Sequence, residues 1–155
     1  MVWRGVIFCF SLISMATNLA AQVTSSSQPE FDSSGKGAVL CTWFIIVDVR
    51  NAIDACFPSE FGDLRVNLTE AIDKTNDFIV ANSPTPVTKE ELNQVIAKRL
   101  AEASAQVAMG GSATGCKSRR DQFIEPMARQ SRDDFHRWLA DFLSVPRKPL
   151  MNPCL

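Results

Sequence analysis

The chain has 155 residues, with 16 Lys and Arg against 17 Asp and Glu, a single His, and a formal charge of −1. An apolar content of 46% and a charged content of 21% are typical of one globular domain, and they exclude a disordered tail or a collagen-like rod. A net charge near zero lacks the electrostatic attraction that non-specific nucleic-acid binding requires, so we expect no nucleic-acid partner.

The first 21 residues have the pattern of a secretory signal peptide. Arg4 supplies a positive charge, residues 6–13 (VIFCFSLI) form a short apolar core, and small residues follow up to Ala21. The apolar run is shorter than the roughly 20 residues that cross a bilayer, so a cleaved signal is favoured over a membrane anchor. We place cleavage after Ala21, with Ala16 as the alternative. The sequence therefore predicts an exported protein, periplasmic or secreted, without a transmembrane span.

The part of the chain after the signal peptide keeps an even number of cysteines, which in an exported chain of this size indicates two disulfides. Residues 22–37 are rich in Ser and Gly and include Pro29, so we predict a flexible leader there. A single helical domain is expected over residues 38–155. The four cysteines of that domain are Cys41, Cys56, Cys116 and Cys154.

The first two predicted helices cover residues 38–56 and residues 63–81. The front half of the first is apolar almost all round, which favours a central, buried helix; its β-branched residues leave a buried strand as the competing interpretation. The second has apolar residues at three- and four-residue steps, could instead begin at Asn67, and ends before Pro84.

The third and fourth helices follow this proline-containing turn. Thr88 and Glu91 have the spacing of a capping box, so the third helix is expected to begin there and to end at residues 110–111 (GG). A loop is predicted over residues 110–115. The last helix is expected from about residue 118 to residue 144, with Pro126 either kinking it or marking a first turn.

Helix geometry limits how the cysteines can pair. Cys41 and Cys56 are 15 residues apart within one predicted helix, which places their Cα atoms about 22 Å apart, whereas a disulfide needs about 7 Å or less. Cys116 and Cys154 flank the last helix and are excluded on the same ground. An up-down-up-down bundle brings Cys56 to Cys116 at one end and Cys41 to Cys154 at the other. The predicted fold is therefore an all-α, four-helix bundle linked by these two disulfides.

We find no residue pattern that indicates catalysis or metal binding. Residues 110–118 approach a P-loop, but Cys116 stands where the motif requires Lys, and a helix rather than a strand precedes the loop. Asp133 and His136 could share a helical face, yet a metal site normally takes at least three protein ligands. We therefore expect no catalytic residue, no metal ligand and no cofactor site, with a hydrolase of unrecognised site as the alternative.

Basic residues concentrate in the last third of the chain. From residue 101 onward there are 8 basic residues against 6 acidic ones, whereas residues 22–100 have 7 against 11. This asymmetry predicts a basic face that could attract an acidic partner, although such charges commonly serve only to keep a helix surface soluble. The candidate partner-facing residues are Arg119, Arg120, Arg129, Arg132 and Arg137.

Several short fragments of the sequence occur in a characteristic order. Cys41 opens an apolar helix that contains Asp48, residues 56–58 (CFP) close it, residues 88–92 (TKEEL) begin a later helix, and Pro153 precedes Cys154. Together these fragments resemble the periplasmic immunity proteins that neutralise secreted bacterial toxins. The glycines of that family's first helix are absent here, and the cysteine spacing differs. The resemblance implies a protein-binding role.

We therefore expect a small exported helical protein that binds another exported protein and does no chemistry. One alternative is a carrier for a small apolar ligand held between the helices, with Met109, Met127 and several Phe residues lining its pocket. A second alternative is an immunity-like inhibitor. The sequence leaves the oligomeric state open.

Overall fold

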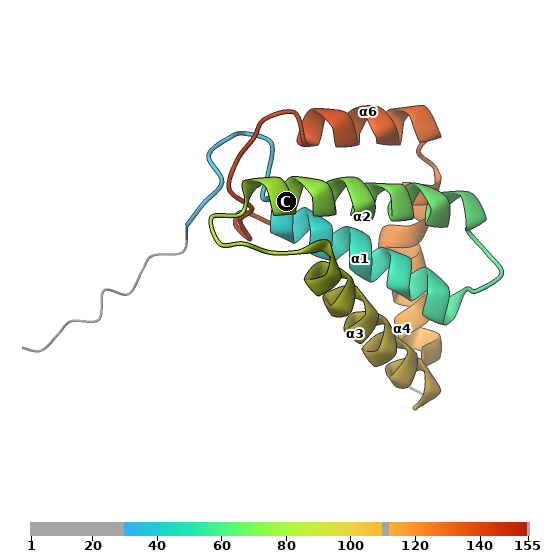
Figure 1. Cartoon of the computed structure of the whole chain (residues 1–155). Helices are drawn as coiled ribbons and strands as arrows, with labels where there is room; N and C mark the ends of the chain where they lie inside the picture. The colour runs from blue at the N-terminus through green and yellow to red at the C-terminus, as the bar shows by residue number, and fades with distance from the viewer. Residues whose placement is uncertain (1–29, 110–111, 155) are drawn as a thin grey trace, which may run out of the picture.

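The computed structural model describes residues 30–109 and 112–154, and it confirms the all-α class for that part of the chain (Figure 1). The predicted signal peptide lies outside the described residues. None of the described helices is both long enough and apolar enough to cross a bilayer. The helices are α1 (Val39–Cys56), α2 (Gly62–Asn82), α3 (Lys89–Ala108), α4 (Ser112–Arg119), the π-helical turn η1 (Arg120–Ile124), α5 (Glu125–Ala128) and α6 (Arg132–Phe142).

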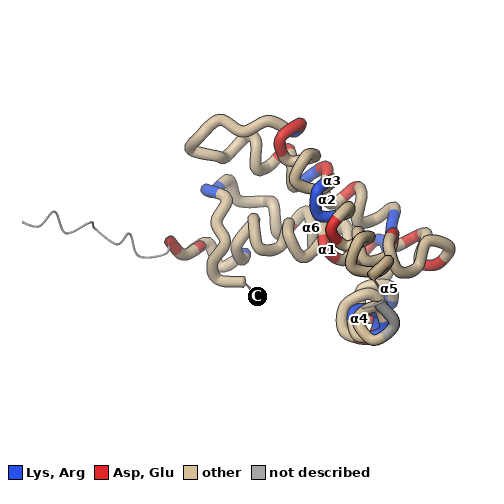
Figure 2. Tube along the Cα trace, turned by 90° about the horizontal axis from the view of Figure 1, so that it is seen from below, with Lys and Arg blue, Asp and Glu red and all other residues tan. Residues whose placement is uncertain are grey.

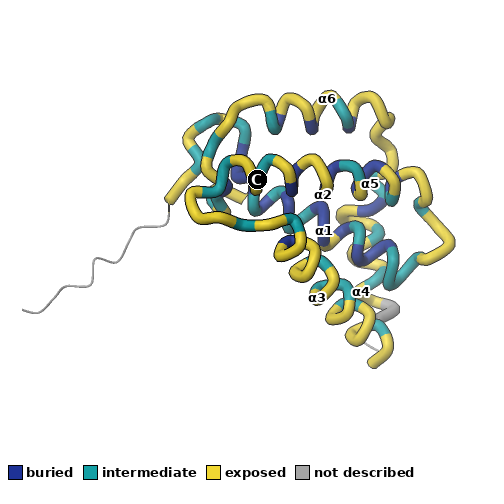
Figure 3. Tube along the Cα trace, viewed as in Figure 1, coloured by how far each residue is buried: buried dark blue, intermediate teal, exposed yellow. Residues whose placement is uncertain are grey.

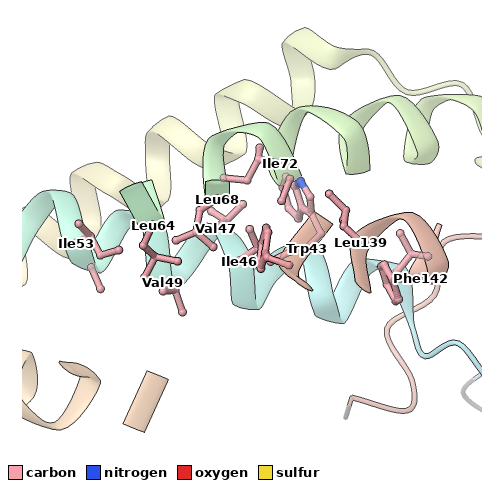
Figure 4. Close-up of a cluster of buried hydrophobic side chains, with 14 of the residues drawn as sticks. Trp43, Ile46, Val47, Val49, Ile53, Leu64, Leu68, Ile72, Leu139 and Phe142 are labelled. Carbon is pink, nitrogen blue, oxygen red and sulfur yellow. The ribbon is translucent and has the colours of Figure 1, made fainter. Parts of the chain in front are cut away.

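Helix α1 is the centre of the core, as its sequence predicts. Helices α2, α3 and α6 pack around it, which explains why it is apolar on nearly all sides. Side chains of α1, α2 and α6 meet in one apolar cluster (Figure 4). Within this cluster the indole N–H of Trp43 donates a 2.7 Å hydrogen bond to Asn76 Oδ1, so its one polar group is satisfied.

The start of α3 confirms the predicted capping box. The backbone N–H of Glu91 donates to Thr88 Oγ1 at 3.2 Å, and the backbone N–H of Thr88 donates to Glu91 Oε2 at 2.8 Å. Leu92 is the one buried residue of α3. One side of the helix packs against α1, and most of its remaining surface is exposed (Figure 3).

The prediction of one continuous last helix is wrong. The chain forms α4, η1 and α5, turns at residues 129–131, and only then enters α6. Ser131 Oγ accepts a 3.1 Å hydrogen bond from the backbone N–H of Asp134, and this cap starts a new helix. Pro126 is the second residue of α5, directly after the π-helical turn η1, where the regular α-helical hydrogen-bond pattern is already interrupted.

Two further corrections follow from this break. Helix α6 runs alongside α2 as a further helix after α4–η1–α5, so the described helices do not form the predicted four-helix, up-down-up-down bundle (Figure 1). Of the loop expected over residues 110–115, residues 110–111 lie outside the described residues, and α4 begins at Ser112.

Residues 30–37 fall in the segment predicted to be a flexible leader, yet they pack against the C-terminal tail. The backbone N–H of Asp32 donates to Asn152 O at 2.7 Å, and Arg147 Nε donates to Asp32 Oδ2 at 2.8 Å. These contacts join segments more than a hundred residues apart, so the local Ser and Gly content does not reveal them. Residues 22–29 lie outside the described residues.

The two disulfides connect the cysteines in the predicted pairs. Cys41 bonds to Cys154 and Cys56 bonds to Cys116, with Cα atoms 5.4 and 5.8 Å apart. The first bond links the C-terminal tail to the start of α1, and the second links α4 to the end of α1. The predicted pairing is correct although the later helices are arranged differently, because the pairing depends only on which helix ends lie close together.

Candidate functional site

Three adjoining hollows lie beside α1: one against α4 and η1, and two between α3 and α4. Their volumes are about 230, 50 and 150 Å³. Arg119 lines all three, and we call this adjoining set of hollows the α1 groove. The groove is apolar at one end and polar at the other.

The apolar end of the groove is formed by α1 and η1. Val49 and Ile124 are 5% and 0% exposed and belong to the core, whereas Phe123 remains 47% exposed at the opening. Ile45 is half-buried beside them. A large aromatic ring at the mouth of an apolar hollow gives a partner side chain a surface to cover.

Small residues leave room for the narrow middle of the groove. Ala52 and Ala55 on α1 face Ala103 on α3 and Gly115 on α4 across this space. The Cys56–Cys116 disulfide lies at the same place and fixes α4 against α1. The spacing between these helices is therefore held covalently.

Arg119 is the exposed cation at the centre of the groove. It makes no ion pair or hydrogen bond with any residue of the described segments. Asp48, which lines the groove beside it, is instead bound to Arg99 at 2.8 Å, and the Arg99 guanidinium lies 4.2 Å from the centre of the Phe44 ring. The apolar end of the groove is thus bordered by one uncompensated positive charge.

The polar end contains a buried amide with an unsatisfied acceptor. Asn51 is 1% exposed; its Nδ2 donates weakly to Ile96 O at 3.5 Å, and its Oδ1 has no hydrogen-bond partner among the described residues. Glu102 and Gln106 of α3 line the same hollow. An unsatisfied buried acceptor costs about 1–3 kcal/mol of stability.

The five arginines predicted to form a basic face do not act together. Arg119 alone lines the α1 groove, and the other four are paired with carboxylates; basic and acidic residues are interspersed along the trace (Figure 2). The pairs are Arg120 with Glu60 and Glu125, Arg129 with Glu125, Arg132 with Glu70, and Arg137 with Asp134. The contact with Glu125 holds the pKa of Arg120 above its usual value.

His136 is on α6, and its side chain faces α2. Its Nε2 lies 3.2 Å from Glu70 Oε2 and 3.3 Å from Arg132 Nε. Asp133, the metal ligand considered beside it, is not among these contacts. Within residues 30–109 and 112–154, no three side chains of His, Cys, Asp or Glu gather closely enough to hold a metal ion.

A second hollow, of about 620 Å³, lies between the start of α2 and the turn from α5 to α6. We call it the α2 hollow. Met127 and Phe61 line it, but Met109 is 78% exposed and lines neither it nor the α1 groove. The two methionines considered for a ligand pocket are therefore not brought together.

Sequence reasoning missed the residues that form the α1 groove. Ile45, Val49 and Phe123 follow the helical apolar pattern, which does not distinguish a groove-lining residue from a core residue. Asn51 and Arg99 are single polar residues on helices and carry no local signal. Their common location depends on the angle between α3 and α4, which is set by packing and by the Cys56–Cys116 bond.

The fold and the groove define the class of this protein: a small all-α protein with two disulfides and an interhelical groove on its surface. No protein-family model, curated protein or solved structure matches the chain.

Proposed function

We propose that the protein is an exported, non-catalytic binding protein that takes a segment of another exported protein into the α1 groove. The observation that supports this proposal is the combination of a solvent-open apolar hollow with the unneutralised Arg119 beside it. Binding sites of this kind use an apolar contact for affinity and a charge for register and association rate.

The lining of the groove specifies the chemistry of the partner segment. An apolar side chain would cover Val49 and Phe123, and an adjacent carboxylate would pair with Arg119. Asp48 does not oppose this carboxylate strongly because Arg99 already neutralises it. Glu102 at the polar end favours a basic or hydrogen-bond-donating residue further along the segment.

Two features support an exported location for this interaction. Disulfides persist in oxidising compartments, and each of the two bonds closes a long stretch of chain, with sequence separations of 113 and 60 residues. The N-terminal 21 residues have the pattern of a signal peptide. A protein that works in the periplasm or outside the cell would meet partners that share this compartment.

Site-specific photo-crosslinking tests the proposal. A photoreactive phenylalanine analogue replaces Phe123 in the groove, and as a control it replaces Val80, which is 40% exposed on α2. We expect crosslinking to one partner protein in the envelope or secreted fraction from position 123 and not from position 80. Equal crosslinking at both positions, or none at position 123, would overturn the proposal.

A charge reversal then tests the role of Arg119 with the purified partner. Arg119→Glu should weaken binding by at least about tenfold, because it places a carboxylate opposite the partner's carboxylate. Arg129→Glu is the matched control, since Arg129 is exposed but does not line the groove. Equal losses in the two variants would show only a general charge effect and would contradict the proposed site.

A further inference from the structure

The α2 hollow shares no lining residue with the α1 groove, so it is a separate feature of the surface. Its volume of about 620 Å³ lies within the range of roughly 300–1,000 Å³ that is usual for small-molecule sites. Its lining combines the first residues of α2 with the end of α5 and the start of α6.

The N-terminus of α2 opens into this hollow. No side chain caps the 21-residue helix, and the backbone N–H groups of Gly62, Asp63 and Leu64 have no acceptor among the described residues. The first turn of a long helix presents such N–H groups together with roughly half a positive charge. An anion placed there would receive several hydrogen bonds at once.

A second polar group in the hollow also lacks a partner. Asn67 is only 8% exposed and lines the hollow, yet its carboxamide makes no hydrogen bond with a described residue. It is not sealed off, because the fully inaccessible unpaired atoms are Arg50 Nε and Asn51 Oδ1. Buried amides are nearly always hydrogen-bonded in folded proteins, so this side chain points to a ligand.

The remaining lining restricts the ligand further. Phe61, Leu64 and Met127 provide an apolar wall. Arg132 adds a cation at the rim; it binds Glu70 at 2.8 Å and has further N–H donors. The carboxylate of Asp63 disfavours a doubly charged ligand, so a single negative charge on an apolar body fits best.

We propose that the α2 hollow binds a small organic carboxylate. The carboxylate accepts hydrogen bonds from the first turn of α2 and from the Asn67 amide, and the apolar body lies against Phe61, Leu64 and Met127. This site is independent of the proposed binding of a protein in the α1 groove, and each can fail without the other.

NMR titration of the full, disulfide-bonded protein with hexanoate tests this site. We expect saturable shifts of the Gly62 amide and of the Asn67 side-chain NH₂ signals with hexanoate. Hexanol keeps the apolar body without the charge, and inorganic phosphate keeps a charge without the apolar body; both should bind at least about tenfold more weakly. Equal binding of either probe, or no shift at Gly62 and Asn67, would overturn the proposal.

Two variants separate a binding role of Asn67 from a structural one. Asn67→Leu should weaken hexanoate binding by about tenfold or more while the thermal midpoint is kept or raised, because an unbonded buried amide is replaced by an apolar group. Asn93→Leu makes the same chemical change on the exposed surface of α3 and should leave binding unchanged. If Asn67→Leu does not fold, Arg132→Gln at the exposed rim should still lower affinity severalfold, and unchanged affinity there would contradict the site.

Discussion

Replacing Arg147 by methionine should destabilise the protein more than the removal of any other charged side chain of the C-terminal tail. The side chain of Arg147 is only 9% exposed, and the side chain of its partner Asp32 is 2% exposed. Its guanidinium donates to Asp32 and to the carbonyl oxygens of Gly37, Phe142 and Val145, at distances from 2.8 to 3.0 Å. One side chain therefore joins the N-terminal segment, the end of α6 and the tail.

The size of the effect follows from what the substitution leaves behind. Methionine preserves much of the side-chain volume beside the rings of Phe78 and Phe142, which lie 5.3 and 5.0 Å from the guanidinium carbon. It leaves the Asp32 carboxylate without its buried cation, and removal of one partner of a buried ion pair costs about 3–5 kcal/mol. For a domain of this size, that loss corresponds to a fall of about 10–20 °C in Tm.

The assay is urea unfolding at pH 7 with both disulfides intact, compared with Lys148→Met. Lys148 is the next residue and also pairs with the N-terminal segment, through Glu30, but its side chain is 45% exposed. An exposed pair contributes about 0–1 kcal/mol, so Lys148→Met should change little. A loss below about 1 kcal/mol in Arg147→Met, or equal losses in the two variants, would refute the reasoning.

Three further predictions concern single local features. Burial raises the pKa of Asp32, but hydrogen bonds from Ser34 and the ion pair with Arg147 outweigh this effect and lower the pKa. The resulting stabilisation is present above pH 4 and is lost as the pH falls through the lowered pKa. Asp32→Asn should therefore flatten the acid side of the stability–pH profile measured by urea titration. Thr88→Ala should cost about 1 kcal/mol in chemical unfolding, whereas an unchanged value would show that the capping box is dispensable. Replacing Cys56 and Cys116 together by Ser should cost about 4 kcal/mol and increase hydrogen exchange in α4, and an unchanged exchange rate there would show that packing alone holds the helix.

The elements that could be predicted from the sequence are those determined by neighbours in the chain. The capping box of Thr88 and the prolines after α2 depend on a few adjacent residues, and both predictions hold. Helix length excluded the pair Cys41–Cys56, and the observed pairs are the predicted ones. The choice of Cys116 as the partner of Cys56 came from the expected bundle, in which the two helix ends meet. Even the missed break before α6 has a local signal, since Ser131 and Asp134 have capping spacing.

The α1 groove was not predictable for a physical reason. Phe123 and Ile124 are adjacent apolar residues of η1. Phe123 remains 47% exposed at the apolar end of the groove, whereas Ile124 is fully buried. Which apolar residue is covered depends on how far α3 and α4 diverge, and no local pattern encodes that angle. The packing of residues 30–37 was missed for the same reason, because their partner Arg147 lies 115 residues beyond Asp32.

The bond between Cys41 and Cys154 has a mechanical consequence. A pulling force applied at residues 30 and 154 would pass directly from the tail into the start of α1, so the helices enclosed between these two cysteines would bear almost none of it. Only the 11 residues from 30 to 40 could extend, by about 40 Å at most. A molecule attached through its two ends would therefore keep the α1 groove intact under tension, as long as the disulfide is oxidised.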